Sequence, residues 1–431
     1  MITQRGVLLF IFGISLSFGA ILLQNAFLAL LGISIIFLFA FANYRFELEA
    51  RSLQINSQRK FSLNKTAVSQ PVECTVTIDL GRDVPFHYHD VVPMFVDTTG
   101  PRSGKATRSA TFKYELSSAN RGLFDIGPTK VTARDPSGLF TKDFVPPNAG
   151  QLLVYPSLGD VKKYDMQMRR RTNVQMQGIR KGIAQGAGTE FIALRKYSPG
   201  DEMRQIDWKA TARTRQLMVR TFQAERKQRI VLLLDCGKMM HAGREVSMLD
   251  AGINTAVLIS HIILKRGDLL GFGTFSNKLE FFLKPGNNRA HFYRMLDALG
   301  RIRPEKETDF ITSFKQLTPL LRKRALVIII SSLHDGGQKH IVDAIKMLKA
   351  HRHAIMVVAP FEPWFEPIQA RERLVKVISD SAAEKYRKDL DAVASSVKRF
   401  GVSVIPVGPQ DMTKTSLQKY VYAVNEGLAT I

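Results

Sequence analysis

The fold of the C-terminal half is decided by the run IVLLL at residues 230–234, which Asp235 follows directly. The run is short, apolar and mostly branched, as central parallel strands are when both of their faces are buried. Runs of the same kind recur further along the chain, at residues 325–330, 354–359 and 402–407. The pattern therefore predicts a parallel sheet in this half.

Amphipathic stripes lie between these apolar runs. Leu249, Ile253 and Val257 fall on one helical face, and similar stripes cover residues 290–299, 311–321, 340–350, 383–398 and 415–427. Strands that alternate with helices form a doubly wound sheet, in which ligands gather at the carboxyl ends of the strands. Residues 229–431 are therefore predicted to form a doubly wound α/β domain.

A segment dense in charge precedes this domain. It reads GTEFIALRKYSPGDEMRQIDWKATARTRQLMVR, spans residues 188–220, and is called the signature segment below. Its SPGD stretch has the chemistry of a turn. Its arginines alternate with Asp201 and Asp207, and bidentate pairs between arginine and carboxylate fix loop geometry well. A solvated connector would not need Trp208, whose ring we expect to be buried against the α/β domain.

Four pieces of this segment, GTEF, LRKYSPGD, RQIDWKATAR and LMVR, resemble the signature of the domain of unknown function 58 family. Proteins of that family are associated with MoxR-type AAA+ ATPases. The resemblance implies that the segment docks such an ATPase and a client protein. The interaction residues would be Arg195, Lys196, Asp201, Arg204, Asp207, Trp208, Lys209 and Arg213.

Two loops of the α/β region, DCGKM and GDLLGFGTFS, resemble von Willebrand factor A domains. In that family, oxygen ligands from three loops hold Mg²⁺, which is a hard cation. The resemblance places Asp235 and Thr308 in two of these loops. However, Gly237 and Met239 replace both serines, and Ser332 stands where the third-loop aspartate belongs. A structural role for Asp235 is therefore favoured over metal binding, and no cofactor is expected, with Mg²⁺ as the alternative.

The sequence carries no pattern typical of an enzyme. Its nine histidines are scattered, and Cys236 has only Lys238 and His241 near it in sequence. The GFG stretch at residues 271–273 lacks the spacing of a dinucleotide loop, and no phosphate-binding lysine loop is present. We therefore expect catalysis to belong to a partner and not to this chain.

Two apolar runs open the chain, at residues 6–23 and 26–42. Each is just long enough to cross a bilayer, so a hairpin of two transmembrane helices is predicted over residues 1–46. A signal peptide fits less well, because the apolar stretch is too long and no small-residue cleavage pattern follows it. Basic residues follow the second run and none lies in the turn. The positive-inside rule then predicts a multi-pass inner-membrane protein with its soluble domains in the cytoplasm.

Residues 47–150 show short alternating runs, such as VECTVTI and ATFKYEL, which predict a β-sandwich-like domain. Residues 151–228 then form a basic linker that contains the signature segment. Between Arg169 and Arg229 the chain has 15 Lys and Arg against 5 Asp and Glu. The net charge of the whole chain is +23. This balance favours a negative partner or surface, which could be an acidic protein, anionic lipid of the inner membrane, or nucleic acid.

The leading hypothesis is a membrane-anchored, non-enzymatic adaptor that works with a MoxR-type ATPase in the assembly or maturation of client proteins or the cell envelope. One alternative is a membrane-linked nucleic-acid binder that uses the basic linker, and another is a divalent-metal-dependent adhesion module. Nucleic acid is disfavoured because neither a helix-turn-helix pattern nor paired aromatic motifs are present. Salt dependence separates the first two, because phosphate-backbone complexes weaken steeply as salt rises.

Overall fold

The computed structural model describes residues 1–156, 159, 161, 185–199, 201, 203–223, 227–333, 337–366 and 373–425. Within it the chain divides into two compact units, Met1–Pro156 and Ser157–Ile431. Part of the predicted basic linker, including the arginine triplet at residues 169–171, lies outside the described residues. The boundary predicted at residue 150 falls on the first residue of a strand, β11 (Gly150–Tyr155).

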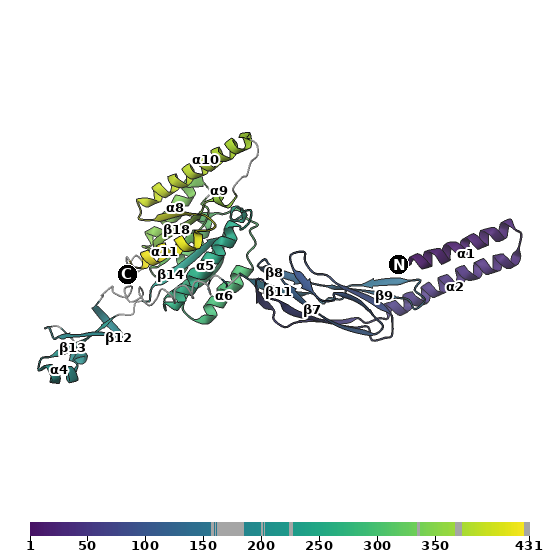
Figure 1. Ribbon diagram of the computed structural model, residues 1–431, viewed down its shortest axis with the longest axis horizontal. Coiled ribbons are helices and arrows are strands. Elements are labelled where there is room, and N and C mark those ends of the chain that lie inside the picture. The colour runs from purple at the N-terminus through teal and green to yellow at the C-terminus, as the bar shows by residue number, and fades with distance from the viewer. Residues whose placement is uncertain are drawn as a thin grey trace. The chain divides into compact units, whose positions relative to one another are not determined.

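The first unit begins with two paired helices, α1 (Gln4–Leu22) and α2 (Ala26–Arg51), drawn in purple in Figure 1. The Thr3 and Asn25 side chains cap their N-termini by accepting backbone N–H groups. Both helices are long and apolar enough to cross a membrane, and only 17% and 11% of their apolar windows are buried. The predicted apolar helical pair is therefore confirmed. Helix α2 continues past the apolar run, which ends at residue 42.

The remainder of this unit consists of strands arranged around one core. The sheet orders are β1-β3-β7-β5, β10-β9-β4-β6 and β2-β11-β8. Besides β11, the strands are β1 (Asn56–Phe61), β2 (Lys65–Ala67), β3 (Val72–Asp79), β4 (Phe86–Asp90), β5 (Asp97–Thr99), β6 (Ser103–Ala106), β7 (Ser109–Ser117), β8 (Gly122–Ile126), β9 (Thr129–Arg134) and β10 (Thr141–Phe144). Alternation along β3 directs Cys74, Val76 and Ile78 into the core. The predicted strand-rich region is confirmed.

An ion pair lies inside this strand-rich core. Arg59 on β1 donates from both Nη atoms to Asp90 at the end of β4, at 2.9 and 2.6 Å, and both side chains are at most 2% exposed. The hydroxyls of Tyr114 and Thr129 donate to the same carboxylate, at 2.5 and 2.9 Å. Buried charges are tolerated only when they are paired and hydrogen-bonded, as they are here.

The second unit contains a hairpin and a six-stranded sheet. The hairpin comprises β12 (Gln185–Lys196), the single turn η1 (Met203–Gln205), helix α4 (Trp208–Thr214) and β13 (Met218–Gln223). The sheet has the order β16-β15-β14-β17-β18-β19. Its strands are β14 (Arg229–Asp235), β15 (Leu269–Phe275), β16 (Leu279–Gly286), β17 (Leu326–Ile330), β18 (Ala354–Pro360) and β19 (Ser403–Val407). All neighbours are parallel except the edge strand β16, which pairs antiparallel with β15.

Helices cover both faces of this sheet (Figure 1). They are η2 (Lys238–His241), α5 (Met248–Lys265), α6 (Arg289–Gly300), α7 (Phe310–Leu317), η3 (Thr318–Leu320), α8 (Gly337–Ala350), α9 (Glu362–Phe365), α10 (Arg373–Lys398) and α11 (Met412–Asn425). Val231 and Leu233 of β14 share a core with α7, α8 and α10. Gly252 of α5 lies against Leu234, on the opposite face. Helix α5 is also apolar enough to cross a membrane, but 67% of its apolar window is buried. The predicted alternation of strands and helices is confirmed.

Candidate interaction site

The signature segment is held in shape first by its backbone. Strands β12 and β13 pair antiparallel, with Lys196 opposite Met218. Beyond the paired strands, Tyr197 N–H donates to the Leu217 carbonyl and Asp207 N–H donates to the Met218 carbonyl, both at 2.8 Å. Because these bonds close the base of the connection, the turn and helix between the strands form a defined projection.

Arg195 and Asp201 form the bidentate pair that the sequence predicts. Arg195 Nη1 donates to Asp201 Oδ2 at 2.8 Å, and Nη2 donates to Oδ1 at 2.5 Å. The Ser198 N–H also donates to Oδ2, at 2.9 Å. The Arg195 bond, aided by Ser198, holds the pKa of Asp201 below its usual range. The pair clamps the end of β12 to the turn that follows it.

Asp207 links the short helix to β13. Its Oδ1 caps α4 by accepting the Ala210 N–H at 3.0 Å, and its Oδ2 accepts Arg220 Nε at 2.8 Å. The bond from Arg220 is the main reason that the pKa of Asp207 lies below its usual range. Asp201 and Asp207 are therefore each engaged by an arginine of the segment itself, and both are scaffold residues.

The remaining predicted interaction residues are exposed. Trp208 is 68% exposed, so the prediction that its ring is buried against the α/β domain is wrong. The physical reason is that Trp208 opens α4 and that Asp207, not the ring, anchors this helix. Met203 is exposed too, at 77%, and no sequence signal points to it. The other predicted interaction residues, Lys196, Arg204, Lys209 and Arg213, are exposed as well.

Asp235 and Thr308, the two predicted metal residues, meet at the carboxyl end of β14. Thr308 Oγ1 donates to Asp235 Oδ1 at 2.7 Å, and the Gly237 N–H donates to the same oxygen at 2.9 Å. The Ser331 hydroxyl donates to Oδ2 at 2.6 Å. This bond comes from Ser331, the neighbour of Ser332, and the assignment of Ser332 to the third-loop aspartate position stays a prediction.

This cluster lies where the strand order reverses, because β15 and β17 flank β14 on opposite sides. Asp235 is 2% exposed, and hydrogen bonds from the protein satisfy its carboxylate. Packing explains the glycine at 237, since a Cβ there would overlap Thr308 Oγ1. Within the described residues, no group of three His, Cys, Asp or Glu side chains is placed to hold a metal. The structural role of Asp235 stays a prediction.

Comparison with known proteins identifies relatives of uncharacterised function. The model of the family described as "Protein of unknown function DUF58" matches residues 193–364, which confirms the resemblance to that family. "Uncharacterized protein YeaD" of Bacillus subtilis is 28% identical over 261 residues, covering 57% of this chain and 61% of that protein. "Uncharacterized protein Rv1480" of Mycobacterium tuberculosis is 23% identical over 208 residues, covering 47% and 64%. The chain thus spans less than two thirds of these relatives.

Two solved structures show a distant likeness. Conserved hypothetical protein BatB from Bacteroides thetaiotaomicron aligns with a TM-score of 0.32 and 13% identity, covering 46% of this chain and 99% of that one. An aerotolerance-related membrane protein from Bacteroides fragilis aligns with a TM-score of 0.29 and 16% identity, covering 45% and 98%. At these scores the likeness carries no argument about function.

Proposed function

We propose that this protein is a membrane-anchored adaptor without catalytic activity of its own, and that its signature segment docks an acidic surface of a partner protein. The observation that carries the proposal is that some charged residues of the segment pair with one another, whereas others are exposed. Two of its carboxylates, Asp201 and Asp207, are held by arginines of the same segment, at 2.5 and 2.8 Å. Trp208 and four basic residues of the segment, Lys196, Arg204, Lys209 and Arg213, are exposed.

Such a surface has the composition of a binding hot spot. Tryptophan and arginine are enriched among the residues that dominate interface energies, and an exposed tryptophan on a fixed scaffold loses little entropy on binding. Exposed cations add complementarity to an acidic surface and raise the association rate. The partner that we infer is a MoxR-type AAA+ ATPase together with its client, because the family resemblance implies it.

We further propose that the α/β unit is a factor A-like domain whose metal position has become structural. The Asp235 cluster supports this, because hydroxyl groups of Thr308 and Ser331 donate to the carboxylate from two neighbouring loops. Helices α1 and α2 would anchor the protein in the inner membrane, with both soluble parts in the cytoplasm. Its role would be in the assembly or maturation of client proteins or the cell envelope.

The direct test is association of the full chain in lipid nanodiscs with the purified MoxR-type ATPase of the same cells, with and without ATP. We expect Lys209→Glu to weaken binding about tenfold, as loss of one complementary charge at an interface does. Lys419→Glu, at an exposed position of α11, makes the same charge change elsewhere and should leave binding unchanged. Equal affinity of both variants and the unmodified chain would refute the docking role of the segment.

Salt dependence tests the nucleic-acid alternative. A complex with a phosphate backbone should weaken by about 10³–10⁵ between 50 and 200 mM salt. Docking through Trp208 and a few charged side chains should weaken far less over the same range. Tight, steeply salt-dependent binding of single- or double-stranded DNA, with no association of the ATPase, would favour the alternative.

A further inference from the structure

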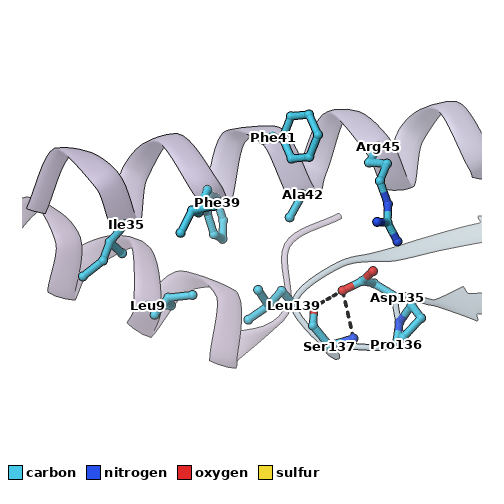
Figure 2. Close-up of a pocket in the computed structure, with 11 residues that line it drawn as sticks. Leu9, Ile35, Phe39, Phe41, Ala42, Arg45, Asp135, Pro136, Ser137 and Leu139 are labelled. Atoms are coloured by element: carbon cyan, nitrogen blue, oxygen red, sulfur yellow. Dashed lines mark hydrogen bonds between the residues drawn. The ribbon is translucent and has the colours of Figure 1, made fainter. Parts of the chain in front are cut away.

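A pocket of about 520 Å³ lies in the first unit, between the membrane helices and the turn that joins β9 to β10. Figure 2 shows Leu9 of α1 and Ile35 and Phe39 of α2 along its apolar part, with Arg45 and Asp135 at its polar end. Its volume falls within the range of about 300–1,000 Å³ that is typical of ligand sites.

The pocket extends along α2 across the point where the apolar run of this helix ends. Ile35 and Arg45 are ten positions apart on α2, which corresponds to about 15 Å along the helix axis. Ile35 lies inside the apolar run, which ends at residue 42, whereas Arg45 lies beyond that end. If α1 and α2 cross the bilayer, the apolar part therefore faces acyl chains and Arg45 lies at headgroup level.

Packing holds the β9–β10 turn against the helices. The Thr3 N–H donates to the Leu139 carbonyl at 2.9 Å, and the rings of Phe39 and Phe140 lie 4.9 Å apart. Lys142 Nζ bonds Glu47 of α2 at 2.6 Å. The walls of the pocket are therefore preorganised, which lowers the entropic cost of binding.

The polar end presents one cation and one carboxylate. The Arg45 side chain is 66% exposed, and its pair with Glu49 is long, at 3.4 Å, so the guanidinium can bind a phosphate group. Asp135 accepts the backbone N–H and the hydroxyl of Ser137, both on Oδ2. In Figure 2 the Arg45 side chain points toward the turn that carries this carboxylate.

We propose that this pocket binds a phospholipid with an ethanolamine headgroup, with one acyl chain along Leu9, Ile35 and Phe39. Arg45 would hold the phosphate and Asp135 the primary ammonium group. A purely anionic headgroup fits less well, because Asp135 and Glu49 would repel it. A choline headgroup has no N–H to donate to the carboxylate. The pocket thus selects a headgroup that combines a phosphate with an N–H donor.

The test is native mass spectrometry of the detergent-purified full chain, titrated with phosphatidylethanolamine, phosphatidylcholine and phosphatidylglycerol of identical acyl chains. We expect phosphatidylethanolamine to bind about tenfold more tightly than the other two, as one additional charge-assisted hydrogen bond allows. Equal retention of the three lipids, or preference for phosphatidylglycerol, would overturn the proposal.

Variants test which lipid group binds at the polar end of the pocket and which binds at the apolar end. Arg45→Ala should reduce phosphatidylethanolamine binding about tenfold, and Asp135→Asn should abolish the preference over phosphatidylcholine. Arg51→Ala, on the same helix but outside the pocket, is the matched control and should bind as the unmodified chain does. Ala42→Phe fills the apolar part and should weaken all three lipids while both polar groups remain. Unchanged binding in Arg45→Ala and Ala42→Phe, with unchanged melting, would place the lipids elsewhere.

Discussion

At the scale of single residues, the strand-rich unit is marked by the buried pair of Arg59 and Asp90. Besides the carboxylate, Arg59 reaches the Asn148 carbonyl through Nε at 2.9 Å. Burial by itself would lower the pKa of Arg59, but the hydrogen bonds and the charge of Asp90 outweigh it and raise that pKa, so the guanidinium stays charged in the folded protein. The sequence cannot reveal this pair, because its members lie on strands of different sheets whose packing is not encoded locally. By contrast, the resemblance to von Willebrand factor A domains places Asp235 and Thr308 in neighbouring loops, and their side chains are hydrogen-bonded at 2.7 Å.

Breaking the buried pair should be strongly destabilising. We expect Asp90→Ala to lower the free energy of unfolding of the first unit by about 3–5 kcal/mol, because it leaves an unpaired charge in the core. Glu73→Ala removes an exposed pair with Lys113, at 3.0 Å, and should cost at most about 1 kcal/mol. Urea unfolding of the full chain in detergent, followed by hydrogen exchange in β1 and β4, measures both. Similar losses for the two variants would contradict the account.

At the scale of elements, the runs that become β14, β17 and β18 could be predicted because buried parallel strands carry their signal in every residue. The hairpin of β12 and β13 could not be predicted from the sequence. Its polar, glycine-containing sequence resembles a linker, and its strands are defined by each other and by two arginine–carboxylate pairs. The edge strand β16 is likewise set by its pairing with β15, because Leu283 is its one buried residue.

The hairpin should have a characteristic pH dependence. The pKa values of Asp201 and Asp207 are lowered in the folded state by Arg195 and Arg220. Their stabilisation is therefore fully present above the unfolded-state pKa of about 3.9 and is lost as pH falls through the lower folded values. We expect hydrogen-exchange protection of residues 203–223 to hold from pH 7 to 5 and to fall below about pH 4. Loss of protection between pH 7 and 5 would exclude these pairs as the clamp.

At the scale of the whole molecule, two apolar helices precede one strand-rich unit and one unit with a mostly parallel sheet. Composition and hydrophobic periodicity could predict this order, because each region has a different period. They could not predict the exposure of Trp208, because burial depends on which surface a short helix presents. The positive charge of the chain likewise indicates an acidic partner without identifying it.

The orientation in the membrane gives a prediction at this scale. Basic residues, Arg45 and Arg51 among them, follow the second apolar run, and none lies in the turn between the helices, so the soluble units should lie in the cytoplasm. Protease added to intact spheroplasts should leave both units uncut, and the same protease should digest them after the membrane is permeabilised. Digestion of residues 56–155 in intact spheroplasts would reverse the assignment.

The central claim is that the signature segment is a docking surface on a fixed scaffold, and Trp208→Ala tests it most directly. Because the ring is 68% exposed, the free energy of unfolding of the full chain should change by no more than about 0.5 kcal/mol. The free energy of binding to the ATPase should weaken by at least about 2 kcal/mol. Trp364→Ala is the matched control: that ring is also exposed, at 47%, packs on Phe361 at 4.8 Å and lies outside the signature segment, so its loss should leave binding unchanged. A stability loss of about 3–5 kcal/mol in Trp208→Ala, or unchanged affinity for the ATPase, would contradict the claim.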